Sequence, residues 1–291
     1  GDLVFAVGDT QTFGSVLFSD SGIDDTHTAE WKFRHVVGVT TVEETRSGTV
    51  TQGAGSGSVS DGFSFDDPGV YTVTLTVTDN DDGTTVSEEN TFVVYDPSEG
   101  FVTGGGWFNS PAGAYVAAPS LTGKGNFGFV SKYVPGKTEP TGQTEFQFKT
   151  GDLAFHSSTY DWLVVSGARA QYKGIGTING AGHFGFKVTV IDGEIDGGED
   201  IDRFRIKIWD IDNGHAVAYD NQVGASDAAT PSTALGGGKI IIHKKGKALH
   251  AASGIATSTV HQDLSNTALQ NAVTQAIEYW AHAGLDVDHL G

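Results

Sequence analysis

The stretch GVYTVTLTVTDNDDG, residues 69–83, decides the fold class of the first part of the chain. Large apolar residues alternate with Val70 and a series of threonines, and the apolar series is Tyr71, Val73, Leu75 and Val77. A period of two with one apolar face is typical of a half-buried antiparallel β-strand. Turn-forming residues bound the run, with Pro68-Gly69 before it and residues 80–83 after it. The stretch therefore predicts a strand that ends in a sharp turn.

Further strand patterns lie on both sides of this strand. The run TFVVYD, residues 91–96, predicts the returning strand, and residues 10–20 and 29–39 predict two strands upstream. The segment GTVTQGAGSGSVSDG, residues 48–62, is rich in Gly and Ser and indicates a loop or a weak edge hairpin. Many short β-branched and aromatic runs separated by turn signals are typical of an all-β sandwich.

The run FSFDDPGVYTVTLTVTDNDDGTTVSEENTFVVYD, residues 63–96, resembles the second half of a PKD domain. Trp31 and Phe33 stand in the place of that family's central Trp-x-Phe, but residues 34–36 are Arg-His-Val where Gly-Asp-Gly is usual. The resemblance covers about residues 3–96, and it sets the first domain at residues 1–96. It implies a small immunoglobulin-like sandwich that acts as a spacer or binding module, and some PKD domains are similar in holding calcium through loop aspartates.

A second β pattern punctuated by glycine occupies residues 101–245. Its strand candidates are residues 101–111, 126–134, 144–157, 161–180, 183–193, 202–212 and 239–245. Strands that follow one another with short turns favour a second β-sandwich, jelly-roll-like, over a parallel sheet. The stretches GGGWF, GFVSKY, FQFKTGDLAFHS, YDWLVV, GARAQYKGIGTING and DRFRIKIWD resemble a domain found directly after PKD domains in large secreted bacterial proteins. That resemblance implies an extracellular setting and leaves the activity open.

The last part of the chain, residues 246–291, is predicted to be a linker followed by an amphipathic α-helix. The helix is expected over residues 265–284, where one apolar stripe consists of Leu269, Val273, Ala276, Ile277 and Trp280. A lone helix of this length must bury its stripe, either on its own second domain or on another chain. The second alternative predicts homotypic assembly through the Trp280 helix, and the sheet edges offer another contact by strand addition.

The composition limits the partners and the setting of the protein. Its 291 residues include 17 basic and 36 acidic ones, which gives a net charge of −19. Nucleic-acid binding requires basic residues that neutralise phosphates, so we expect no nucleic-acid partner. No run of about 18 apolar residues occurs, so no membrane-spanning helix is expected. Because the chain contains no Met and starts at Gly1, we expect a mature product or an excised piece of a longer chain. The absence of Cys does not indicate a compartment, and the expected location outside the cell or on its surface is what the resemblance to PKD-containing proteins implies.

A dense acidic stretch, IDGEIDGGEDID at residues 191–202, lies between two strand candidates. Calcium binds six to eight oxygen ligands from carboxylates, carbonyls and water. Acidic residues at close spacing, with Gly to let the backbone turn, suit that geometry, and the candidate ligands are Asp192, Asp196, Asp200 and Asp202. A solvated hairpin tip without metal and a catalytic carboxylate pair remain as alternatives.

Two further acidic clusters lie in the first domain, at residues 20–25 and 79–83. Loops that join different strands of a sandwich meet at the same end, so both clusters can share one cation that relieves their repulsion. The candidate ligands are Asp20 and Asp24 in the first loop and Asp79 and Asp81 in the second. A plain hairpin turn is the alternative for residues 79–83, since Asn-Asp and Asp-Gly are favoured in such turns.

Signatures of catalysis are absent from the sequence. It contains no HExxH, no GxSxG and no Cys, and the glycine-rich runs GTINGAG (176–182) and TGGGW (103–107) indicate tight turns rather than phosphate loops. Aromatic residues can also stack on sugar rings, and the candidates are Trp107, Phe108, Tyr115, Tyr133, Tyr160 and Trp162. The sequence thus predicts a non-catalytic, calcium-stabilised extracellular module for adhesion or structural assembly. The alternative is a polysaccharide-binding accessory piece of a secreted hydrolase.

Overall fold

The computed structural model describes residues 2–244, and these form an all-β protein, as the sequence predicts. The predicted linker and Trp280 helix at 246–291 lie outside the described residues. Eighteen β-strands and one 3-10 turn, η1 (Lys149–Gly151), follow one another along the chain. They build two large hydrophobic cores, the first from residues between 5 and 94 and the second from residues between 102 and 242, and Val93, Trp162 and Val164 form a third, smaller cluster.

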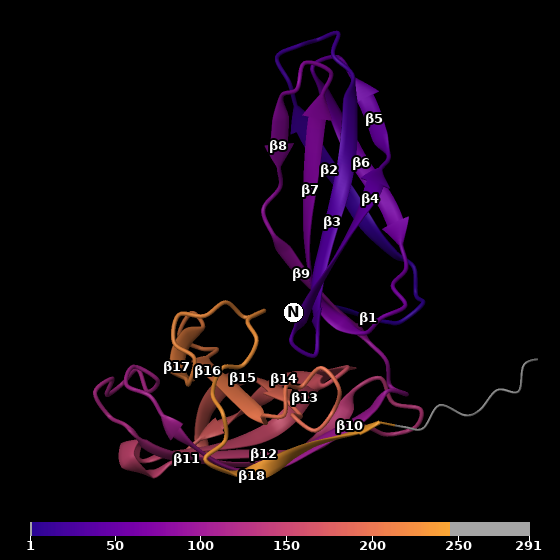
Figure 1. Ribbon diagram of the computed structural model, residues 1–291. Helices are drawn as coiled ribbons and strands as arrows, with labels where there is room; N and C mark the ends of the chain where they lie inside the picture. Colours follow the sequence, from indigo (N-terminus) through magenta and orange to yellow (C-terminus); the bar gives the residue numbers. More distant parts are fainter. Residues whose placement is uncertain (1, 245–291) are drawn as a thin grey trace, which may run out of the picture. The chain divides into compact units, whose positions relative to one another are not determined.

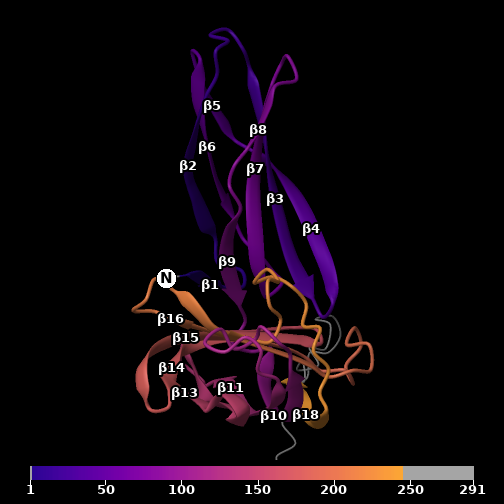
Figure 2. The same cartoon turned by 90° about the vertical axis from the view of Figure 1, so that its left-hand side faces the viewer.

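The first core lies between two sheets, which Figure 2 shows as two layers. The larger sheet has the order β1-β9-β7-β3-β4, with β8 also paired to β7, and the smaller has the order β2-β6-β5. The strands of the larger sheet are β1 (Leu3–Ala6), β3 (His27–Val37), β4 (Thr40–Gly48), β7 (Gly69–Asp79), β8 (Thr84–Val86) and β9 (Asn90–Tyr95). The smaller sheet consists of β2 (Gln11–Ser19), β5 (Val50–Gly53) and β6 (Ser56–Phe63). Residues 48–62 thus form strands of an edge hairpin.

The alternation in the sequence becomes the two faces of the larger sheet. All four apolar residues of the 71–77 series are buried, and Leu75 on β7 pairs directly with Trp31 on β3. Trp31 and Phe33 are 4% and 1% exposed, so both belong to the core. Figure 1 shows β7 and β3 side by side along the first sandwich. Because inward residues occur at every second position, a shift by one residue would expose the whole apolar face.

A single nine-stranded antiparallel sheet builds the second part, in the order β17-β16-β15-β14-β13-β12-β11-β10-β18. Its strands are β10 (Gly100–Ser110), β11 (Gly123–Tyr133), β12 (Pro140–Phe148), β13 (Leu153–Ser166), β14 (Arg169–Ile178), β15 (Ala181–Ile191), β16 (Arg203–Asp210), β17 (Ala216–Asp220) and β18 (Gly237–Lys244). Consecutive strands pair with one another up to β17, and β18 returns to pair with β10. This connectivity is a meander and differs from the expected jelly-roll-like arrangement, since short turns keep each strand beside its predecessor.

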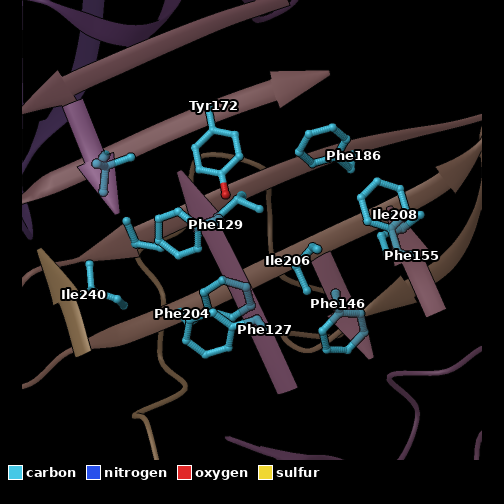
Figure 3. Packing of buried hydrophobic residues seen from close by; sticks show 14 of the residues in the cluster. Phe127, Phe129, Phe146, Phe155, Tyr172, Phe186, Phe204, Ile206, Ile208 and Ile240 are labelled. Carbon is cyan, nitrogen blue, oxygen red and sulfur yellow. The ribbon is translucent and has the colours of Figure 1, made fainter. Parts of the chain in front are cut away.

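The long sheet bends over its own inner face, and aromatic side chains fill the space between its two halves. Phe127 on β11 stacks on Phe204 on β16 with ring centroids 4.0 Å apart, although four strands separate β11 from β16 in the sheet. Figure 3 shows these two rings in contact, with Phe129 and Tyr172 next to them. The tight turn at Asn179-Gly180, where both residues have positive φ (52° and 75°), joins β14 to β15. The core of a two-layer β structure therefore forms from one curled sheet.

Candidate cation site

Two acidic loops of the first sandwich converge, as the sequence predicts. Asp20, Asp25 and Asp79 each contribute a carboxylate oxygen, and these oxygens lie within 4.8 Å of one another. The backbone N–H of Thr26 donates to Oδ1 of Asn80 at 3.0 Å, which ties the first loop to the second. In residues 2–244 this is the one group of three acidic, His or Cys side chains close enough to share a cation.

The strand ends hold two of the three carboxylates in place. Asp20 directly follows β2, and its carboxylate accepts hydrogen bonds from the N–H of Gly22 (3.2 Å) and faces Nε2 of the buried His27 (3.1 Å). Asp79 is the last residue of β7, and its Oδ1 accepts from the N–H groups of Asp81 and Gly83, both at 2.8 Å. These bonds engage one oxygen of Asp79 in the turn. Its other oxygen receives no hydrogen bond within the described residues.

The carboxylates differ in their electrostatic environment. The pKa of Asp20 lies below its ordinary value, chiefly because the Gly22 N–H bonds to the ionised form and His27 adds to this effect. The pKa of Asp25 lies above its ordinary value because of desolvation and repulsion from Asp20, Asp81 and Asp79. A carboxyl group that resists ionisation beside two others indicates negative charge without a local counter-ion.

Asp24 and Asp81, which the sequence names as ligands, are exposed and do not belong to the group of three. Asp25 takes the place expected for Asp24. In an extended or bent loop, neighbouring side chains point in different directions, so a run of two aspartates does not reveal which of them faces inward. The residues that bring the loops together, Asn80 and Thr26, carry no metal signature in the sequence.

The acidic loop at 192–202 uses its carboxylates in another way. Asp192 accepts hydrogen bonds from the N–H groups of Glu194 (3.1 Å) and Ile242 (2.8 Å). Asp202 accepts from those of Gly193 (2.8 Å) and Ile240 (2.7 Å). Ile240 and Ile242 belong to β18, the end strand of the nine-stranded sheet, so the two aspartates bind the outer backbone donors of that strand.

The other acidic residues of this loop point to solvent or form ion pairs. Asp196 and Asp200 are exposed, Glu199 pairs with Arg203 at 2.8 Å, and Glu194 pairs with Lys239 at 2.8 Å. None of them joins a three-residue cation group in the described part of the chain. The structure thus separates the four predicted ligands into two backbone acceptors and two solvated side chains.

A row of basic residues crosses three neighbouring strands of the second part. Lys173 on β14, Lys187 on β15 and Lys207 on β16 stand directly opposite one another in the strand register. Lys173 pairs with Asp2 at 2.9 Å and Lys207 with Asp227 at 2.7 Å. Lys187 donates to the backbone carbonyl of Asp227, and burial lowers the pKa of Lys187 to about 8. Asp2 and Asp227 thus compensate two of the three charges in this row.

This lysine row lines a cavity of about 450 Å³ that also contains Trp209. The Trp209 indole lies against the backbone at Gly185, where any Cβ would collide with the ring. Lys173 Nζ lies 5.8 Å from the centre of the Trp209 ring. Trp209 was not among the aromatic residues that the sequence singles out, although the alternation of its strand places it on the face opposite to the buried Phe204, Ile206 and Ile208.

The predicted sugar-stacking aromatics mostly contribute to packing. Phe108, Tyr160 and Trp162 are at most 6% exposed, and Tyr115 and Tyr133 pack against the second core. Trp107 lies under Lys124, whose Nζ is 3.8 Å from the ring centre. Of these residues Trp162 also lines the 450 Å³ cavity, and its indole N–H donates to Asp2 at 2.7 Å.

Comparisons with known proteins do not place the chain in a family. No family model matches it, and no curated protein matches it. A crystal structure of an uncharacterized protein from Listeria monocytogenes EGD-e, in complex with α-D-glucose, β-D-glucose, magnesium and calcium, aligns over 75% of this chain and 18% of that protein, with 9% identity and a TM-score of 0.25. A second structure of the same protein aligns over 74% of this chain with the same score. A TM-score of 0.25 does not establish a common fold. Within residues 2–244, no helix is long and apolar enough to cross a membrane.

Proposed function

We propose that the protein is a non-catalytic extracellular or cell-surface module for adhesion or structural assembly, in which calcium joins two loops of a PKD-like sandwich. The observation that carries this proposal is the convergence of Asp20, Asp25 and Asp79, with oxygens within 4.8 Å of one another. These side chains come from the ends of β2 and β7 and from the start of β3, so a bound cation would connect both sheets of the sandwich.

The donor set fits a hard cation. Calcium prefers carboxylate and carbonyl oxygens and accepts irregular geometry, and three carboxylates leave room for backbone carbonyls and water in its coordination shell. The cation would also remove the repulsion that raises the pKa of Asp25. The backbone hydrogen bonds of Asp192 and Asp202 favour a structural role for these two carboxylates over the catalytic pair that the sequence left open.

Calcium is expected to stabilise the native protein. At 5 mM calcium and a dissociation constant of 0.1–1 mM, which is common in extracellular modules, the gain is about 1–2 kcal/mol. For a sandwich of this size, each kcal/mol of added stability raises the melting temperature by roughly 4–8 °C. The measurement is differential scanning calorimetry with calcium and with excess chelator.

Matched variants locate the effect. Asp79→Asn and Asp25→Asn should lose most of the calcium-dependent shift, whereas Asp196→Asn, which removes the same charge from the other acidic loop, should retain it. If the wild-type protein melts at the same temperature with calcium and with chelator, this loop contact holds no calcium and the proposal is wrong.

Polysaccharide binding is a second candidate function, and the cavity at Trp209 is the observation that favours it. An aromatic ring provides a flat apolar surface for a sugar ring, and charged side chains around it offer hydrogen bonds to hydroxyl or carboxylate groups. Trp209 lies in a cavity with Lys173, Lys207 and Asp227. Asp2, Asp161 and Asp227 in the lining balance the three lysines of the row, so the cavity selects no charge and both neutral and acidic polysaccharides are candidates.

Replacement of Trp209 by alanine is expected to weaken polysaccharide binding about tenfold, equivalent to roughly 1.4 kcal/mol. The measurement is depletion of the protein from solution by insoluble neutral and acidic polysaccharides. Trp107→Ala, which removes a tryptophan that does not line the cavity, is the control and should bind like the wild type. Equal retention of both variants, or no binding of the wild type to any of these polymers, would exclude this site.

A further inference from the structure

A buried arginine without an acidic partner lies beside the lysine row. Arg169, the first residue of β14, is 1% exposed. Its Nη2 donates to the carbonyls of Ala228 and Ala229, both at 3.3 Å, while Nε and Nη1 have no hydrogen-bond partner. Within residues 2–244 no carboxylate forms an ion pair with it, and the charged groups that act on it, Arg205 and Lys187, are also positive.

Such an arrangement is costly unless another group completes it. A buried charge normally has an opposite charge and hydrogen bonds to every polar atom, because removal from water costs several kcal/mol otherwise. Arg205 illustrates the usual solution, since its guanidinium makes two hydrogen bonds to the carboxylate of Asp220. Burial and Arg205 lower the pKa of Arg169 to about 10, so the guanidinium still carries its charge at neutral pH.

The same arginine lines a cavity of about 280 Å³ that contains a second unsatisfied group. His35 on β3 is 6% exposed, lines the cavity, and has no hydrogen-bond partner at Nε2. Arg34 and Gln171 also line it. The one acidic lining residue is Glu43, and its carboxylate pairs with Lys32 at 3.0 Å outside the lining. Arg34 is paired with Glu89 at 2.9 Å, so Arg169, His35 and Gln171 are the donor groups that this cavity offers, and no free carboxylate borders it.

We propose that this cavity binds a small oxyanion, with Arg169 as its charged ligand and His35 Nε2 as a further donor. The guanidinium supplies N–H donors at Nε and Nη1, which match the oxygens of a carboxylate, sulfate or phosphate group. Residues 34–43 of the first sandwich and residues 169–171 and 226–230 of the second part all border the site. The anion would thus join these segments, and this role does not depend on calcium.

Inorganic phosphate, sulfate and acetate are the probes of this site. In a low-salt Tris buffer at pH 7.5, one of the three at 20 mM is expected to raise the melting temperature by about 2–4 °C above sodium chloride of the same ionic strength. The ranking of the three separates a tetrahedral anion from a carboxylate. The shift should vanish in Arg169→Met and persist in Lys132→Met, which removes an exposed lysine outside the cavity.

The stability of Arg169→Met in the absence of an oxyanion distinguishes binding at this site from general salt effects. Without an oxyanion, Arg169→Met should be at least as stable as the wild type, because it removes an uncompensated buried charge. If that variant does not fold, His35→Gln is the substitute and should reduce the anion-dependent shift by at least half. Equal anion shifts in the wild type and Arg169→Met, or a crystal structure grown with the best anion that shows only water at Nε and Nη1, would overturn the proposal.

Discussion

Asp220→Ala is expected to lower the free energy of unfolding by about 3–5 kcal/mol, the usual cost of removing one partner from a buried ion pair. Asp220 on β17 accepts from Nε of Arg205 at 3.1 Å and from Nη2 at 2.8 Å. The two side chains are 9% and 4% exposed, respectively. Without the carboxylate, Arg205 stays buried beside the equally positive Arg169. Urea denaturation at constant pH measures the change.

A double variant tests the origin of this loss. Arg205→Met with Asp220→Leu removes both charges and replaces them with apolar side chains of similar volume, so it should be clearly more stable than Asp220→Ala alone. A loss below about 1 kcal/mol for Asp220→Ala would show that water reaches Arg205 and that the ion pair behaves like one at the surface.

The double variant Asp192→Ala with Asp202→Ala is expected to lose about 3–6 kcal/mol, whether or not calcium is present. Each carboxylate accepts two backbone hydrogen bonds, at 2.7–3.1 Å. Four bonds to charged acceptors at about 1.5–3 kcal/mol each would sum to about 6–12 kcal/mol, and we expect about half of this because water can hydrate the N–H groups once the side chains are removed. The loss should be visible as an earlier unfolding transition and as faster amide hydrogen exchange at Ile240 and Ile242.

The exposed Asp196 provides the matched control in the same loop. Asp196→Ala should change stability by less than about 0.5 kcal/mol, because its side chain is solvated. The contrary result would be a calcium-dependent increase in melting temperature that the wild type shows and Asp196→Ala lacks. That result would restore the cation site that the acidic spacing of 192–202 predicts and would contradict the backbone-acceptor role.

Strands with one buried face were predictable from the sequence. The alternation at 71–77 and the Trp31-x-Phe33 pattern both mark residues that turn inward, and the structure buries them. Strand β4 carries no such signal, because TTVEETRSG is almost entirely exposed on an outer strand and gains its conformation from pairing with β3. Strand β17 has five residues and little apolar periodicity, so the sequence did not predict this strand or its pairing with β16.

The sites were predictable only where chain order dictates proximity. Loops that follow β2 and β7 meet at one end of a sandwich, so the meeting of Asp20 and Asp79 follows from topology. The partners of Asp192 and Asp202 lie on β18, some 40 to 50 residues later in the chain. No local pattern encodes a contact across a curled sheet. The burial of Arg169 was not predictable for the same reason, because it depends on segments that are far from Arg169 in the sequence.

The two aspartates that bind the outer N–H groups of β18, Asp192 and Asp202, also bear on how copies of this chain can meet. GGKIIIHK contains three consecutive isoleucines on an end strand, a combination that favours amyloid-like stacking. Asp202 and Asp192 occupy the outward N–H groups of Ile240 and Ile242. An incoming strand would have to displace two charged acceptors before it could form its own ladder with this edge. The acidic loop thus covers the backbone of this edge at Ile240 and Ile242, so strand addition by a second copy is disfavoured there.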